Sequence, residues 1–94
     1  MSYQPRKRFG QNFLIDDQII NRIVSTISPK KSDDIVEIGP GKGALTFPLL
    51  EHLDHLSVIE IDRDLISLLK LKKQDKLTIY EADALKFDYG LISN

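Results

Sequence analysis

The fold of this chain is decided by one glycine-rich stretch, Glu37-Ile38-Gly39-Pro40-Gly41-Lys42-Gly43. The β-branched run at residues 35–38 predicts a short strand that ends at the first glycine. Residues 45–53 predict a helix, in which a proline is tolerated only in the first turn. The first glycine allows a tight turn, and the second leaves no side chain where a ligand would approach the backbone. The helix start adds free N–H groups and a positive dipole end, so the stretch predicts a site for phosphate, carboxylate or ribose hydroxyls.

The rest of the chain alternates strands and helices in the same way. An apolar face at helical spacing follows a capping Asp16 or Asp17 and stops before Pro29. Residues 56–61 and 77–80 predict two more strands, with a helix between them. This alternation predicts an α/β fold, a partial Rossmann-like parallel sheet of three strands with flanking helices. A complete domain of this type has more strands, so we expect the chain to be truncated.

Composition narrows the class of protein. The 94 residues carry 29% charged side chains, a net charge of −1 and no cysteine, which is typical of one small soluble domain without disulfides or thiolate chemistry. No apolar run reaches the roughly 18 residues of a membrane span, and the polar N-terminus does not resemble a signal peptide. We therefore expect a cytoplasmic protein.

Basic residues open the chain. Arg6, Lys7 and Arg8 are adjacent, and no acidic residue precedes Asp16. Such an arm can contact phosphate locally. On charge alone, a solvated tail is the more common interpretation.

Two acidic residues follow the later strands. Glu60 stands 21 residues after Gly39, where a carboxylate can accept hydrogen bonds from both hydroxyls of a ribose. Asp83 comes just after the third strand, where it can accept from the exocyclic amine of an adenine. Strand ends of a parallel sheet line one crevice, so these positions predict a nucleoside site. Asp62 and Asp64 are better interpreted as residues that open a helix.

The glycine spacing alone leaves two cofactors open. Gly39, Gly41 and Ala44 also fit the dinucleotide pattern, so a half-domain that binds NAD is an alternative. A nucleotide-triphosphate loop is excluded, because neither Ser nor Thr follows Lys42. Glu37, two residues before the first glycine, would repel a diphosphate but tolerate the sulfonium-bearing methionine of S-adenosylmethionine. This favours S-adenosylmethionine.

At this point several motifs together resemble a known family. The segment Arg6-Lys7-Arg8-Phe9-Gly10-Gln11-Asn12-Phe13-Leu14 resembles the N-terminal signature of the rRNA adenine N6,N6-dimethyltransferases. Residues 37–46 resemble their cofactor loop, and residues 58–65 and 83–85 resemble the next two motifs, so the resemblance covers nearly the whole chain in register. One branch of the family dimethylates two adjacent adenosines near the 3′ end of small-subunit rRNA. The other acts on large-subunit rRNA and confers macrolide resistance. The Arg-Lys-Arg-Phe-Gly lead-in and the Gly-Pro-Gly loop resemble the first branch.

The resemblance implies a division of the chain and a role for each matched residue. Residues 1–15 would form a basic arm and a segment that closes over the cofactor, and residues 16–94 the N-terminal half of the S-adenosylmethionine-binding domain. At the methionine end of the cofactor the family places Gln11, Asn12, Leu14, Gly39, Gly41 and, as a third glycine, Gly43. At the nucleoside end it places Glu60 on the ribose, Ile61 against the adenine ring, and Asp83 and Ala84 beside the adenine amine. Arg6, Lys7 and Arg8 would contact phosphates of small-subunit rRNA in an immature ribosomal subunit.

The resemblance also implies what to expect of catalysis. The family aligns the target amine with an Asn-Leu-Pro-Tyr motif after a fourth strand, and this sequence contains no such motif. We therefore expect no catalytic residue in this chain, no metal, and no activity of the chain by itself. A non-catalytic relative that keeps the fold for ribosome or transcription binding is a further alternative. The intact cofactor residues argue against it.

Overall fold

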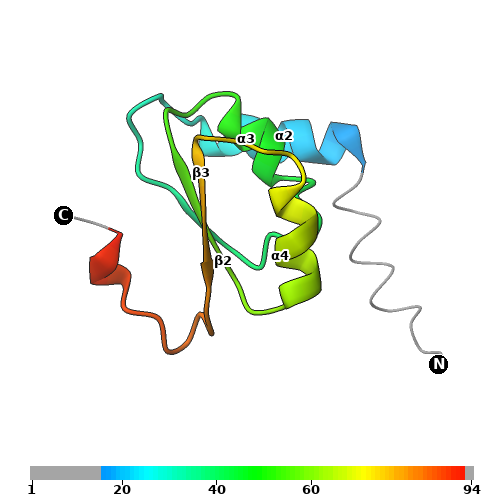
Figure 1. Ribbon diagram of the computed structural model, residues 1–94. Helices are drawn as coiled ribbons and strands as arrows, with labels where there is room; N and C mark the ends of the chain where they lie inside the picture. The colour runs from blue at the N-terminus through cyan, green and yellow to red at the C-terminus, as the bar shows by residue number, and fades with distance from the viewer. Residues whose placement is uncertain (1–15, 93–94) are drawn as a thin grey trace.

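A computed structural model describes residues 16–92 of the chain (Figure 1). Within this part, β1 (Val36–Ile38), β2 (Leu56–Glu60) and β3 (Leu77–Glu81) form one parallel sheet in the order β1-β2-β3. Helix α2 (Asp17–Ile27) precedes β1, α3 (Thr46–Leu50) lies between β1 and β2, and α4 (Arg63–Lys70) lies between β2 and β3. The predicted three-stranded parallel α/β architecture is confirmed.

The three helices lie on one side of the sheet (Figure 1). The main core forms between them and the sheet, from apolar side chains of every layer: Ile20, Val24, Leu49, Leu50, Leu53, Leu56, Val58 and Leu69. The central strand β2 is buried along its whole length. Its residues Leu56 and Val58 face the helices, so alternation places Ser57 and Ile59 on the helix-free side.

The helix ends follow local chemistry. Asp16 caps α2 by accepting from the backbone N–H groups of Gln18 and Ile19, and Asp62 caps α4 in the same way. Helix α2 ends before Pro29, where Ser28 takes a left-handed conformation with φ 51°. Of the two predicted capping residues, Asp16 is the cap and Asp17 lies in the first turn, and the helix-opening role of Asp62 is confirmed.

Two elements differ from the sequence prediction. Helix α3 covers only Thr46–Leu50, whereas the pattern predicted a helix over residues 45–53. Past its end, the N–H groups of His52 and Leu53 donate to carbonyls three residues back, so the chain tightens into a turn. A 3-10 helix, η1 (Tyr89–Leu91), follows β3 and was not predicted. No helix in the described part of the chain is long and apolar enough to cross a membrane.

Candidate functional site

The carboxyl ends of the three strands meet at one edge of the sheet. The N–H of Gly39 donates to the carbonyl of Ile59 at 2.9 Å, and the N–H of Ala82 donates to the carbonyl of Glu60 at 3.1 Å. These bonds extend the ladder past the ends of the strands and set Gly39, Glu60 and Ala82 side by side. The glycine turn and both predicted acidic residues are therefore brought to the same edge, as the parallel order predicted.

The glycine turn has three glycines with positive φ: Gly39 at 66°, Gly41 at 60° and Gly43 at 90°. Residues that carry a side chain rarely adopt this backbone conformation, so glycine is favoured at all three positions. A Cβ added at Gly39 or Gly41 would meet no atom within 4 Å, whereas one at Gly43 would run into the ring of Phe47. Open space thus lies over the first two glycines. Gly43 packs against the core, which does not support the expectation that it lies beneath the ligand.

Glu37 links the strand before this turn to the helix after it. Its side chain is half-buried, and its Oε1 accepts a 2.6 Å hydrogen bond from Oγ1 of Thr46, the first residue of α3. Burial raises the pKa of Glu37 above its ordinary value of 4.5, and the hydrogen bond from Thr46 partly opposes this by lowering the pKa. Thr46 is fully buried, and sequence reasoning did not assign it a role. A hydroxyl at the start of an apolar helix was the available signal.

Glu60 is held rigidly by the chain that follows it. The residue is 7% exposed, and its Oε2 accepts from the backbone N–H groups of Ile61 and Asp62, both at 3.0 Å. Among the described residues, no hydrogen bond engages its Oε1. One carboxylate oxygen is therefore fixed by the backbone, and the other, which has no donor within residues 16–92, has the chemistry to accept from a ribose hydroxyl.

Asp83 lies in a turn beside Glu60. Its Oδ1 accepts from the N–H of Leu85 at 2.9 Å, and the next carbonyl, that of Ala84, accepts from the hydroxyl of Tyr89 at 2.8 Å. Ile61 is 63% exposed at the same edge of the sheet. An exposed apolar side chain beside carboxylates suits one face and the amino edge of an adenine.

Other predicted site residues lie outside the described part of the chain: Arg6, Lys7, Arg8, Gln11, Asn12 and Leu14. Within residues 16–92, no group of three His, Cys, Asp or Glu side chains is placed to hold a metal ion.

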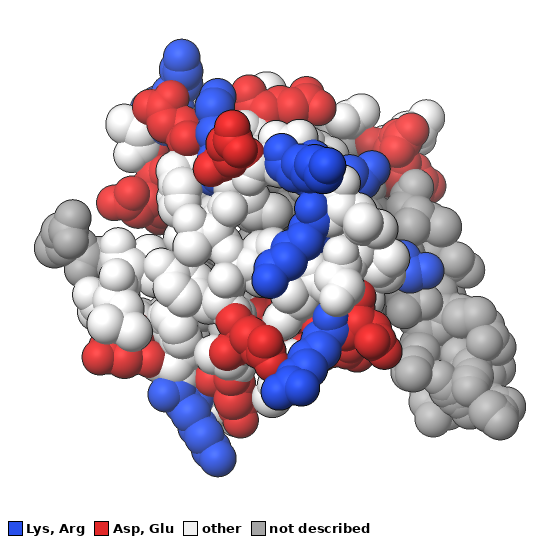
Figure 2. Space-filling model, in the orientation of Figure 1, with Lys and Arg blue, Asp and Glu red and all other residues white. Residues whose placement is uncertain are grey.

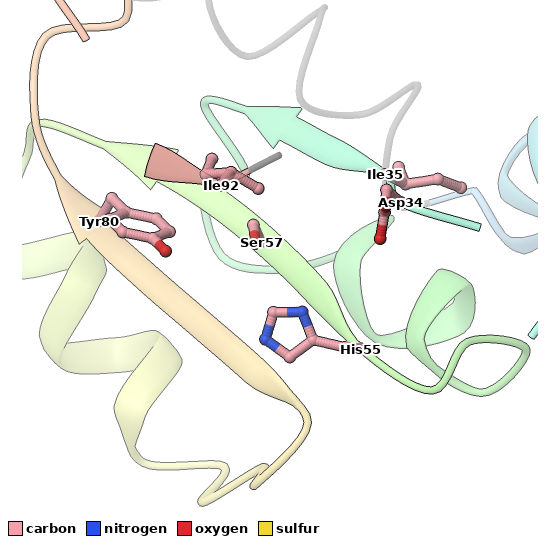
Figure 3. A pocket seen from close by; sticks show the side chains of 6 residues that line it. All are labelled: Asp34, Ile35, His55, Ser57, Tyr80 and Ile92. Atoms are coloured by element: carbon pink, nitrogen blue, oxygen red, sulfur yellow. The ribbon is translucent and has the colours of Figure 1, made fainter. Parts of the chain in front are cut away.

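A separate hollow lies on the helix-free side of the sheet (Figure 3). It is lined by Asp34, Ile35, His55, Ser57, Tyr80 and Ile92. His55 also shares a 2.6 Å hydrogen bond with the hydroxyl of Thr78 on β3. Because His55 immediately precedes β2, this hollow reaches the amino ends of the strands and is distinct from the edge that carries the glycine turn.

Comparison with known proteins agrees with this arrangement. The family model of the ribosomal RNA adenine dimethylases matches residues 3–93. Ribosomal RNA small subunit methyltransferase A of Methylobacillus flagellatus is 57% identical over the whole chain. The chain spans only about a third of the length of the curated relatives it matches. It covers 37% of the Methylobacillus flagellatus protein and 36% of the protein of the same name from Thiobacillus denitrificans.

Solved structures show the same fold. A dimethyladenosine transferase from Plasmodium falciparum superimposes with a TM-score of 0.69 and 35% identity, over 76% of this chain and 27% of that one. The N-methyltransferase NodS from Bradyrhizobium japonicum, in complex with S-adenosyl-l-homocysteine, gives a TM-score of 0.61 and 27% identity, over 88% of this chain and 38% of that one. The sheet is thus part of the Rossmann-like fold of class I methyltransferases, and the chain belongs to the ribosomal RNA adenine dimethylase family.

Proposed function

We propose that this chain supplies the cofactor-binding part of an S-adenosylmethionine-dependent rRNA methyltransferase. The reaction would dimethylate the N6 amines of two adjacent adenosines near the 3′ end of small-subunit rRNA, during maturation of the subunit. One observation carries the proposal. In a chain of this family, the open glycine turn, the free oxygen of Glu60 and the carboxylate of Asp83 lie along one edge of the sheet.

The residues at this edge fit S-adenosylmethionine. Gly39 and Gly41 leave room for the methionine part against the backbone, the free oxygen of Glu60 suits the ribose, and Ile61 with Asp83 suits the adenine. Bound there, the cofactor supplies a methyl group on a sulfonium, which is already a good leaving group. The work of this chain is then to hold and orient the cofactor. Gln11, Asn12 and Leu14 would close over its methionine end.

The substrate assignment rests on family membership and on the N-terminal arm. The 57% identical relative is named a small-subunit methyltransferase, which favours small-subunit over large-subunit rRNA as the target. Arg6, Lys7 and Arg8 would contact phosphates of that RNA. An rRNA substrate also favours a cytoplasmic location.

Calorimetric titration tests the cofactor. Wild-type chain is titrated with S-adenosylmethionine and separately with NADH, alongside the variants Glu60→Gln and Glu81→Gln. Glu81 is the register partner of Glu60 on β3, but it is exposed and pairs with Arg63, so it makes a matched control. Loss of a hydrogen bond to a charged group costs about 1.5–3 kcal/mol, so Glu60→Gln should weaken binding by roughly 10- to 150-fold. Tighter binding of NADH, or equal binding by both variants, contradicts the assignment.

A chimera tests the rRNA target. This chain replaces the matching N-terminal part of the Methylobacillus flagellatus relative, and the product is assayed for methyl transfer to immature small subunits. Two methyl groups on each of two adjacent adenosines are expected. Transfer to large-subunit rRNA instead would show that the target assignment is wrong.

A further inference from the structure

Lysines are concentrated in the segment that connects α4 to β3. The lysine patch consists of Lys70, Lys72, Lys73 and Lys76, with Asp75 as the one acidic residue among them. The remainder of residues 16–92 has six basic side chains against thirteen acidic ones. Positive charge in the described part of the protein is therefore concentrated in one short segment of an otherwise acidic body.

The backbone presents these lysines outward. Lys70 ends α4, and the N–H groups of Leu71, Lys72 and Lys73 each donate to carbonyls three residues back, which turns the chain sharply. Lys73 itself has a positive φ of 50°. All four lysines are exposed, and the ion pair found among the described residues, Arg63 with Glu81, engages none of them. Figure 2 shows basic side chains following one another over α4 and the turn after it.

The surface beside the patch is grooved. Lys70 and Lys73 line a groove between the end of α4 and β3, and Leu69, Leu77 and Ile79 contribute its apolar lining. Strand β3 is an edge strand of the described sheet. Gln74 and Asp75 complete the lining, so two lysines and one acidic residue border this hollow.

Nζ of Lys72 lies 5.7 Å from the ring centroid of Phe47, the side chain that packs beside Gly43. The rest of the patch lies near the amino end of β3. It precedes the start of β3 at Leu77, whereas Asp83 and the glycine turn follow the carboxyl ends of the strands. A five-residue strand is about 15 Å long, so Lys73 and Lys76 are separated from Asp83 by roughly the length of β3. A ligand that touches both ends of this strand must be a large, folded molecule.

We propose that the lysine patch binds the phosphate backbone of folded small-subunit rRNA, as a contact remote from the target adenosines. This inference rests on the proposed function. The acidic remainder of the described body repels a polyanion, so its contact with RNA has to be made through local clusters of cations. Phosphates of an RNA helix recur at short intervals along a curved surface and match several closely spaced ammonium groups. Such a contact would select folded rRNA over a short strand that carries the same target sequence.

Two charge-matched double variants of this chain test the proposal. Lys73→Gln with Lys76→Gln removes two patch lysines. Lys30→Gln with Lys31→Gln removes two exposed lysines that stand among Asp33, Asp34 and Asp54. Binding of a fluorescent transcript of the 3′ domain of small-subunit rRNA is measured by anisotropy across a salt series, with poly-glutamate as a second probe.

The patch variant should bind the transcript about tenfold more weakly at low salt. The slope of log affinity against log salt should fall in magnitude by roughly 1.5, because each lost phosphate contact contributes about 0.7–0.9. The control should keep the wild-type slope. Equal slopes for both variants, no binding of the transcript by wild type, or preferential binding of poly-glutamate would each overturn the proposal.

Titration with S-adenosylmethionine separates this inference from the proposed function. Both lysine variants should bind the cofactor as wild type does, because neither substitutes a residue of the glycine turn or of the carboxyl ends of the strands. If Glu60→Gln leaves cofactor binding intact while the patch variant loses RNA, the cofactor assignment fails and the patch stands.

Discussion

Substituting two glycines of the same turn separates a packing role from a binding role. Gly43→Ala and Gly39→Ala each add one methyl group at a position with positive φ, 90° and 66° respectively. The added methyl at Gly43 would stand 2.7 Å from Cδ2 of Phe47 and 3.1 Å from Cδ2 of Leu69. At Gly39 it would meet nothing within 4 Å. The two variants therefore share the backbone strain and differ in the steric clash.

The structure sets the expected size of that difference. A left-handed conformation costs an L-residue about 1–2 kcal/mol, and this applies to both variants. Overpacking a close-packed region adds about 1–3 kcal/mol, and this applies to Gly43→Ala alone. For a domain of this size, 1 kcal/mol shifts the melting temperature by roughly 4–8 °C. Gly43→Ala should therefore melt about 5–20 °C below Gly39→Ala.

Cofactor titration should rank the same variants in the opposite order. Gly39→Ala fills space over the turn where the ligand approaches, so it should lose S-adenosylmethionine affinity while remaining folded at the assay temperature. Thermal unfolding by circular dichroism and calorimetric titration give the two readouts. Equal melting temperatures for the variants would refute the packing role of Gly43. Unchanged cofactor affinity in Gly39→Ala would refute the assignment of the open space to the ligand.

The remaining predictions concern the supports of the site. Thr46→Val removes the donor to half-buried Glu37 and should cost about 1–3 kcal/mol in urea unfolding, whereas Thr46→Ser keeps a donor and should cost much less. Because burial raises the pKa of Glu37, the folded state keeps a proton that the unfolded state loses, so stability should fall as pH rises above about 4.5. Glu37→Gln should flatten this dependence in melting curves taken across pH, and an unchanged curve would show that Glu37 does not cause it. Asp16→Ala removes the α2 cap and should cost about 1 kcal/mol in urea unfolding, whereas Asp17→Ala should cost less.

Much of the fold could be predicted because its signals are local. The β-branched runs before Gly39 and at β2, the helical spacing in α2 and the capping Asp16 all act over a few residues. The length of α3 could not be predicted in this way. Its apolar pattern continues to Leu53, but beyond Leu50 the chain tightens into a turn instead of extending the helix.

The position of the site could also be predicted, for a geometrical reason. Parallel strands end at one edge, so any sequence with this alternation brings the glycine turn, Glu60 and Asp83 together. The roles assigned to these residues, and to Gln11, Asn12 and Leu14, stay predictions until binding is measured.

The sequence by itself determined the order of elements, their parallel connection, the family and the edge at which the predicted site residues meet. All of these follow from local periodicity, turn chemistry and motifs. Only the tertiary structure decided which glycine packs and which is open, that Thr46 holds Glu37, and that the N–H groups of Ile61 and Asp62 fix one oxygen of Glu60. It also decided that Lys70 and Lys73 line a groove beside β3 while Lys72 lies over the ring of Phe47. These features depend on contacts between residues of different elements, and such contacts are set by how helices and strands pack.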